Sequence, residues 1–215
     1  LQIQIDFMQI HKDYTMCWTN GLHENCRTGV KNIYNRYPKS CDSNVEDIIA
    51  KGGEFIPTCS IVVRADIYFN IPDKAKGYYC GDYPLQVWTA HIGKTYYFAD
   101  VTCNYRAYAN GSWTNKVSAE SKVLRLKRFY DETRMLDGLN EATEHKHVDS
   151  FEIIMANNLF YLATTAGEYD LAKPYLFMRD KFGINTDKYI RCLIQKKHIK
   201  ALAIKIYRKI MRRFM

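Results

Sequence analysis

The front of the chain alternates short runs of β-branched and aromatic residues with helical patterns. Strand-like runs fall at residues 14–19, 59–63 and 94–105. Helical patterns fall at residues 1–10, 45–50 and about 81–91. Residues 1–10 are expected to be the end of a helix, with Ile3, Phe7 and Ile10 on one stripe. The polar stretch between 20 and 43 predicts a long surface loop, so the front of the chain should mix helices with strands.

After residue 115 the pattern becomes helical throughout. Four or five helices are expected there, and turn-forming residues predict breaks near Gly138, between His145 and Val148, and near Gly167 and Gly183. A helical-hairpin repeat between Ala163 and Ala172 is only faintly indicated. We therefore predict two domains, residues 1–115 and residues 116–215.

The charge is distributed unevenly between these two parts. The net charge of the chain is +8. Residues 1–115 contain 11 basic and 11 acidic side chains, whereas residues 116–215 contain 20 basic and 12 acidic ones. The last stretch, residues 196–215, carries eight basic residues and no acidic one. This asymmetry predicts a neutral front domain followed by a basic element.

The basic stretch has the spacing of an amphipathic helix. Its apolar side chains recur with helical period between Ile199 and Phe214, and basic residues fill the other face. Such a helix can lie on an anionic membrane surface, or it can pack on its own domain and leave its charges in water. Both interpretations stay open. Nucleic-acid binding is disfavoured, because no interleaved aromatic platform or known binding motif accompanies the charge.

Cysteine usage and hydropathy give expectations about the compartment. The seven cysteines are scattered and form neither a Cys-x-x-Cys pair nor a Cys/His group with zinc spacing, which favours reduced thiols. No signal peptide is recognised, and no apolar run has the length of a membrane span. The expected location is cytoplasmic, with possible attachment to the inner face of the plasma membrane. Because Leu1 begins the chain, we expect that it starts inside a longer reading frame or was processed.

Asp82 is the carboxylate with the most suggestive position. It precedes Tyr83-Pro84 at the predicted start of a helix, where a proline is tolerated because the first-turn amides lack helical partners. From the residues alone, an N-cap is the favoured role for such an aspartate. A carboxylate that accepts helix amide hydrogen bonds is a weaker base. A catalytic Asp82 must therefore point partly away from the helix.

Four motifs in order change that balance. They are Glu54-Phe-Ile-Pro-Thr-Cys-Ser-Ile-Val-Val-Arg64, Gly81-Asp-Tyr-Pro-Leu-Gln86, Gly93-Lys-Thr-Tyr-Tyr-Phe98 and Tyr105-Arg-Ala-Tyr-Ala-Asn-Gly-Ser-Trp113. Together they resemble the C-terminal half of bacterial family 2 glycosyltransferases of the GT-A fold, over about residues 1–115. The resemblance implies an α/β fold class, the C-terminal portion of a Rossmann-like mixed sheet, followed by a helical tail.

The resemblance also implies roles. Asp82 would be the general base that deprotonates an acceptor hydroxyl of a saccharide or lipid-linked acceptor as it attacks a nucleoside diphosphate sugar with inversion. Arg106 and Ser112 would approach the leaving diphosphate. The other implied substrate-binding residues are Thr58, Cys59, Gly81, Tyr83 and Trp113. Trp88 could also face a sugar, but core packing is the favoured role for an aromatic residue on a helix stripe.

Two departures from the family pattern limit the resemblance. Family members often have a histidine where this chain has Tyr108, and a phenol is a poor ligand for Mg²⁺ or Mn²⁺. The chain also has no Asp-x-Asp motif, and the nearest match, Glu168-Tyr-Asp170, is better interpreted as a helix start. The parent enzyme is expected to use Mg²⁺ or Mn²⁺ with ligands outside this chain. By itself the chain is then expected to be inactive.

Other interpretations remain. The acidic pair Glu46-Asp47 has the composition of a base, but it precedes the Phe-Ile-Pro-Thr loop within a short predicted helix. The main rival from another class is a non-catalytic module that uses its basic helix to dock on membranes or partners. A nucleic-acid binder is the second rival, and it would show strongly salt-dependent binding.

Overall fold

The computed structural model of the chain describes residues 1–195, which form two compact units. The first unit combines Leu1–Glu120 with Arg134–Phe151, and the second combines Ser121–Thr133 with the residues from 152 onward. The predicted basic helix between Ile199 and Phe214 lies outside the described residues. The division into domains of residues 1–115 and 116–215 stays a prediction.

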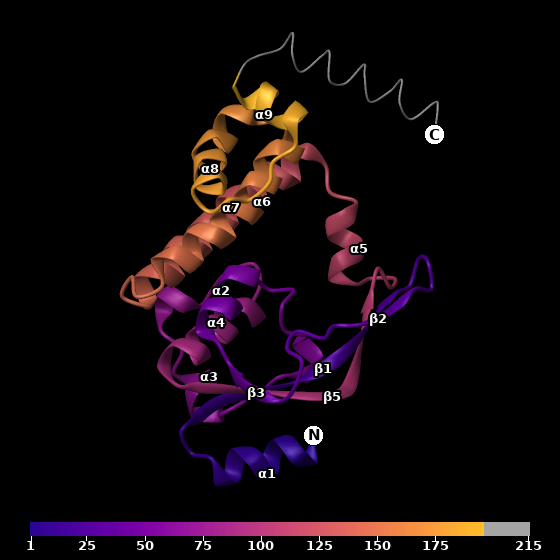
Figure 1. Cartoon of the computed structure of the whole chain (residues 1–215), viewed down its shortest axis with the longest axis vertical. Helices are drawn as coiled ribbons and strands as arrows, with labels where there is room; N and C mark the ends of the chain where they lie inside the picture. The colour runs from indigo at the N-terminus through magenta and orange to yellow at the C-terminus, as the bar shows by residue number, and fades with distance from the viewer. Residues whose placement is uncertain (196–215) are drawn as a thin grey trace. The chain divides into compact units, whose positions relative to one another are not determined.

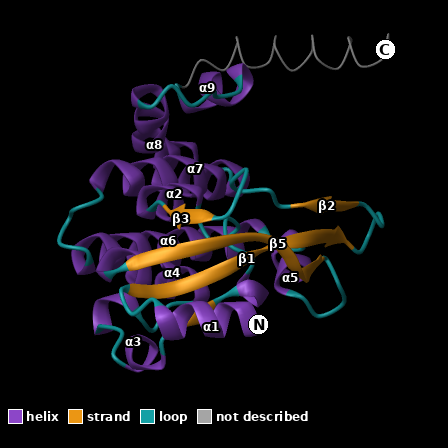
Figure 2. Cartoon of the chain, turned by 60° about the horizontal axis from the view of Figure 1, so that its bottom comes forward, coloured by secondary structure: helices purple, strands orange, loops and turns teal. Residues whose placement is uncertain are grey.

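The first unit is built on a mixed five-stranded sheet, shown in orange in Figure 2. The strand order is β2-β1-β5-β3, and β4 also pairs with β1. β1 is parallel to β5, whereas β2 and β4 are antiparallel to β1, and β3 is antiparallel to β5. The strand bounds are β1 Tyr14–Asn25, β2 Lys31–Ile33, β3 Cys41–Ser43, β4 Val62–Val63 and β5 Lys94–Ala107. The expected α/β class with a mixed sheet is therefore confirmed.

Helices cover both faces of this sheet. α1 lies on one side, and α2 and α4 lie on the other (Figure 1). The helices of this part of the chain are α1 Gln2–Ile10, α2 Val45–Lys51, α3 Ala65–Phe69, α4 Asp82–Ile92 and α5 Trp113–Ser118. Two short 3₁₀ helices, η1 Thr58–Ser60 and η2 Asp73–Ala75, occupy the connections. The arrangement is three-layered.

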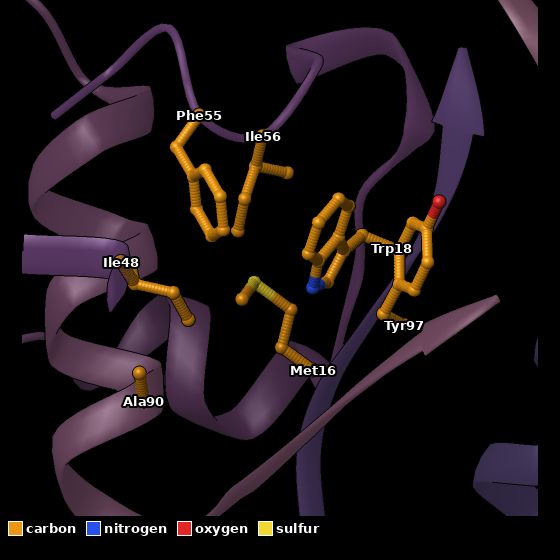
Figure 3. Packing of buried hydrophobic residues seen from close by; sticks show 7 residues of the cluster. All are labelled: Met16, Trp18, Ile48, Phe55, Ile56, Ala90 and Tyr97. Carbon is orange, nitrogen blue, oxygen red and sulfur yellow. The ribbon is translucent and has the colours of Figure 1, made fainter. Parts of the chain in front are cut away.

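Each face of the sheet has its own hydrophobic core. Figure 3 shows the larger one, in which Trp18 and Tyr97 meet at 4.5 Å between ring centroids and Ile48 and Ala90 approach from α2 and α4. Met16, Phe55 and Ile56 complete this cluster. Successive strand side chains point to opposite faces, so Cys17 and Phe98 face the other core with Met8 of α1. The central strands are therefore buried on both sides.

A single arginine fixes α1 to this framework. The Arg64 guanidinium donates to the carbonyl oxygens of Met8, His11 and Tyr14, at 2.7, 2.8 and 2.7 Å. The last carbonyls of a helix lack helical partners, so a cation there satisfies them and opposes the negative end of the helix dipole. Of the stripe predicted on α1, only Phe7 packs on the core. Ile3 and Ile10 are exposed, whereas Gln4 and Met8 are buried.

The strand predictions were confirmed in part. β5 follows the predicted run closely, but β1 continues to Asn25, well beyond the predicted end at Thr19. The run at 59–63 gives only β4, because η1 takes up its first residues. The predicted loop between 20 and 43 contains the end of β1 together with β2 and β3. These edge strands have three residues each and mostly exposed side chains, so they leave little hydrophobic pattern.

The second unit is helical throughout the described residues. It contains the first part of α6 (Lys122–Ala142), most of α7 (Val148–Ala166), α8 (Tyr169–Lys181) and α9 (Lys188–Ile194). Arg179 of α8 donates to the Ala156 carbonyl, the Asn157 side chain and the Thr186 hydroxyl, at 3.1, 3.0 and 2.9 Å. The breaks predicted near residues 145–148, Gly167 and Gly183 are confirmed. Within residues 1–195, no helix is both long and apolar enough to cross a membrane.

Gly138 was predicted to break a helix, and this prediction was wrong, because α6 runs through it. A methyl group at this position would lie 2.0 Å from the Tyr78 hydroxyl and 2.9 Å from the Lys74 carbonyl oxygen. The glycine therefore permits close packing against the segment that follows η2, at the cost of some helix propensity.

We expect Gly138→Ala to lower the free energy of unfolding by about 1–2 kcal/mol, although alanine favours helices, because the added methyl overpacks the contact. Urea unfolding would measure the change. In the double variant with Tyr78→Phe, part of the loss should be recovered, since the nearest colliding atom is gone. A more stable Gly138→Ala protein would contradict this explanation.

A chain of polar side chains links α2, α4 and the turn before α7 within the first unit. His147 Nδ1 lies 3.1 Å from Glu46 Oε1, and His147 Nε2 lies 3.2 Å from His91 Nδ1. A carboxylate only accepts, so His147 Nδ1 donates to Glu46. A neutral His147 then accepts from His91 through Nε2. Both imidazoles can be neutral with every one of these contacts satisfied.

Burial lowers the pKa of His91, and the neighbouring His147 and Lys146 lower it further, against an opposing effect of Glu144. An unfolded histidine titrates near about 6.5 and binds protons more readily than the folded His91, so acidification below that pH favours unfolding. We therefore expect the free energy of unfolding to fall between about pH 7.5 and 5.5. This fall should be smaller in His91→Gln than in the exposed-site control His145→Gln, as measured by urea unfolding. Equal pH dependence in both variants would exclude this role of His91.

Candidate functional site

The candidate site lies at the edge of the sheet where β1 and β5 end. The C-terminal end of α4 is beside the start of β1, because Thr15 Oγ1 donates to the Thr89 carbonyl at 2.8 Å. The N-terminus of α4, with Asp82, is therefore directed toward the carboxyl ends of these two parallel strands. Open α/β sheets commonly bind ligands at this edge.

Asp82 is held from two directions. It is the first residue of α4, and Gly81 takes the N-cap position that was predicted for Asp82. The Thr58 hydroxyl donates to Asp82 Oδ2 at 2.6 Å, and the Tyr83 amide donates to Oδ1 at 3.0 Å. Each carboxylate oxygen has a second lone pair, and the side chain is only partly buried. Asp82 is thus oriented by the protein and keeps acceptor capacity.

Aromatic side chains from β1, β5 and the β2–β3 connection gather near this carboxylate. The ring of His23 stacks on Tyr105, with centroids 6.1 Å apart, and meets Tyr34 edge-on at 5.7 Å. Burial raises the pKa of Tyr105, and the negative charges of Glu54 and Asp82 raise it further. All three rings are partly buried, and Tyr105 is the member of this cluster that Asp82 affects. His23 and Tyr34 were missed because neither belongs to a motif or to a predicted element.

Arg36 supports the loop that carries Thr58. Its guanidinium donates to the carbonyl oxygens of Glu54 and Phe55, at 2.6 and 2.9 Å, and its Cζ lies 4.7 Å from the centroid of the Tyr34 ring. Burial lowers the pKa of Arg36, but neighbouring Tyr34 and Glu54 oppose that effect. Because Arg36 falls in the predicted loop, no pattern in the sequence indicated this role.

The residues predicted to approach the diphosphate lie at the end of β5 and the start of α5. Arg106 is exposed on β5 beside Glu24 of β1. Ser112 is the N-cap of α5 and accepts from the Asn115 amide at 3.3 Å, so its oxygen already has a structural function. Trp113 is half-exposed and stacks on Tyr79 with centroids 5.8 Å apart. This stacking connects α5 to the loop just before Asp82.

Tyr108, at the position of the family histidine, has an unusual backbone. Its φ is 60°, in the left-handed region that a residue with a bulky side chain seldom adopts. Its amide donates to Thr114 Oγ1 at 2.7 Å, and the Arg27 guanidinium lies 4.5 Å from the centroid of its ring. These two contacts hold the backbone of Tyr108 in a strained conformation. Such strain is concentrated at functional sites.

Two predicted site residues have other surroundings. Tyr83 is buried, and its hydroxyl donates to the Ile49 carbonyl at 2.9 Å, so the side chain joins α4 to α2 and does not line the candidate site. Gly81 is exposed, and a methyl group there would meet no atom within 4 Å. Trp88 is partly buried, and its ring centroid lies 5.7 Å from that of His91.

The alternative acidic groups have structural partners. Glu46 contacts His147, and Asp47 pairs with Lys51 at 2.8 Å while accepting from the Tyr37 hydroxyl at 3.0 Å. Glu168 is the N-cap residue of α8, as the helix-start interpretation predicts. Among residues 1–195, no group of three or more His, Cys, Asp or Glu side chains could hold a metal ion.

Tyr83→Phe tests the packing role of this residue. We expect the variant to lose about 1–2 kcal/mol of stability, because it leaves the buried Ile49 carbonyl without this donor. Chemical denaturation would measure the loss. Gly81→Ala should remain within about 0.5 kcal/mol of the parent, since the position is open. A Tyr83→Phe protein of unchanged stability would show that the bond contributes nothing.

Comparisons with known proteins do not assign a family or function to the chain. No protein-family model matches the chain, and searches of curated proteins and of solved structures find no significant match.

Proposed function

We propose that this chain forms the acceptor-side half of an inverting, nucleotide-sugar-dependent glycosyltransferase with a GT-A-type sheet. The observation that supports this proposal most directly is the geometry of Asp82. Its carboxylate stands at the start of α4, is oriented by Thr58 and the Tyr83 amide, and is close enough to the partly buried Tyr105 to raise the pKa of that residue. The mixed sheet with its parallel β1–β5 pair is compatible with this assignment.

The proposed chemistry needs a base in a fixed position. The acceptor hydroxyl attacks the anomeric carbon while the bond from that carbon to the diphosphate oxygen breaks. As the new bond forms, the hydroxyl becomes acidic, and Asp82 accepts its proton. The hydrogen bond from Thr58 fixes the Oδ2 atom, so the remaining lone pairs of the carboxylate have a defined direction. Aromatic faces such as those of Tyr105 and His23 suit the apolar face of a sugar ring.

The region at the end of β5 supplies groups suited to the leaving diphosphate. Arg106 is exposed there and carries a permanent positive charge, which stabilises negative charge that develops on a leaving group. The metal expected for the parent enzyme would neutralise part of the same charge when bound. The ligands of that metal are expected outside this chain.

Asp82→Asn is the decisive substitution. In the full translated product that contains this chain, we expect turnover to fall by about 10²–10⁴-fold, because asparagine cannot accept the proton. Release of nucleoside diphosphate would be measured over a panel of sugar donors and acceptors, together with donor binding and the melting temperature. Donor binding and melting temperature should change little.

Asp66→Asn provides the matched control, since Asp66 is an exposed acid in the first turn of the short helix α3. It should retain full turnover. If Asp82→Asn instead lowers the melting temperature and leaves turnover intact, Asp82 is a structural helix-start residue and the enzymatic proposal fails.

A further inference from the structure

Two cysteines meet beside the candidate site. Cys59 is exposed on η1, and Cys103 is half-buried on β5. Their side chains interact directly, and Cys103 Sγ also lies 3.9 Å from the Asn20 carbonyl oxygen. The sequence does not predict this contact, since Cys59 and Cys103 are far apart in the chain and form no spacing motif.

The backbone makes room for this contact at Gly21. Gly21 pairs with Cys103 across β1 and β5, and a methyl group on it would lie 2.9 Å from Cys103 Sγ and 3.3 Å from Pro57 Cγ. The absent side chain thus leaves room for both the Cys103 sulfur and Pro57, the residue directly before η1, to approach the backbone of β1. The proximity of the two thiols therefore follows from the packing of η1 on β5.

We propose that Cys59 and Cys103 form a dithiol site that closes into an intramolecular disulfide by exchange with a low-molecular-weight disulfide such as oxidised glutathione. This inference goes beyond the proposed glycosyl transfer and does not depend on it. It assigns a covalent modification to both cysteines. Of the two, only Cys59 was among the predicted substrate-binding residues.

The exchange is balanced in two steps. The Cys59 thiolate, which is accessible to solvent, attacks one sulfur of the small disulfide, forms a mixed disulfide and releases one small thiol. The Cys103 thiolate then attacks the Cys59 sulfur and releases the second small thiol. Two protein thiols are oxidised, the small disulfide is reduced to two thiols, and the protons of Cys59 and Cys103 pass to solvent and to the released thiolates.

The second step should be slow at neutral pH. Burial raises the pKa of Cys103 to about 12, and the neighbouring Cys59 thiol contributes to the rise. Since only the thiolate attacks, the rate of ring closure should increase about tenfold per pH unit over the range in which the thiol predominates. Once Cys59 is in a mixed disulfide it can no longer carry a charge, so its part of the effect on Cys103 disappears.

Closure would act on the segment that orients Asp82. Thr58, which donates to Asp82, is adjacent to Cys59, and a disulfide would tie η1 covalently to β5. Because the link closes a long loop in the unfolded chain, it should also stabilise the protein. Oxidation of the two thiols would thus make the segment around Thr58, which orients the Asp82 carboxylate, more rigid.

The test uses the whole chain treated with oxidised glutathione between about pH 7 and 9. Peptide mapping by mass spectrometry after alkylation should find a Cys59–Cys103 disulfide, preceded by a glutathione adduct on Cys59. The melting temperature should rise by about 5 °C, and amide hydrogen exchange should slow in the segment around Thr58. Dithiothreitol should reverse all three changes.

Three serine variants separate the possibilities. Cys103→Ser should stop at the mixed disulfide on Cys59, and Cys59→Ser should abolish the linkage, whereas the exposed-site control Cys26→Ser should close normally. A mixed disulfide that persists on Cys59 in the parent protein at pH 9, or a disulfide between other cysteines, would overturn the proposal. Because no readout is enzymatic, these results are independent of whether the chain transfers sugars.

Discussion

The parallel pairing of β1 with β5 is the constraint on which the rest of the first unit depends. The two strands are paired from Tyr14 to Asn25 and from Lys94 to Ala107, and both hydrophobic cores are built on their two faces. A parallel connection requires a crossover, and α4 provides the last part of it. The pairing therefore directs the start of α4, and Asp82 with it, to the edge where β1 and β5 end.

The pairing is irregular near the site, and side chains compensate for the irregularity. The register shifts on both sides of Asn20, where β5 contains extra residues. Asn20 Oδ1 accepts from the Gly21 and Asn35 amides at 2.9 and 3.1 Å, and its Nδ2 donates to Asn35 Oδ1 at 3.1 Å. Such bulges often redirect side chains beside functional sites. Here the irregularity precedes His23 and Tyr105, whose rings meet at the candidate site.

The strongly patterned elements could be predicted from the sequence, and those defined by tertiary packing could not. β5, α2 and α4 combine long or well-capped patterns with clear stop signals, and their predicted bounds nearly match. Gly138 misled the prediction because its role is close packing against Tyr78, which local sequence cannot reveal. At the site, the motifs singled out both Thr58 and Asp82, which the structure brings into contact. They missed Arg36 and His23, since both depend on contacts between segments with no periodic pattern.

The position of Asp82 also resolves a conflict between two demands on a carboxylate. At a helix start, a backbone amide and the helix dipole hold the carboxylate in place and favour the fold, whereas a general base needs lone pairs that can face the acceptor hydroxyl. Glycosyl transfer with inversion tolerates a weak base, because the hydroxyl loses its proton only as the new bond forms. Orientation then matters more than basicity. Thr58 supplies that orientation from a separate segment of the chain, so a residue that stabilises the helix can also serve the proposed reaction.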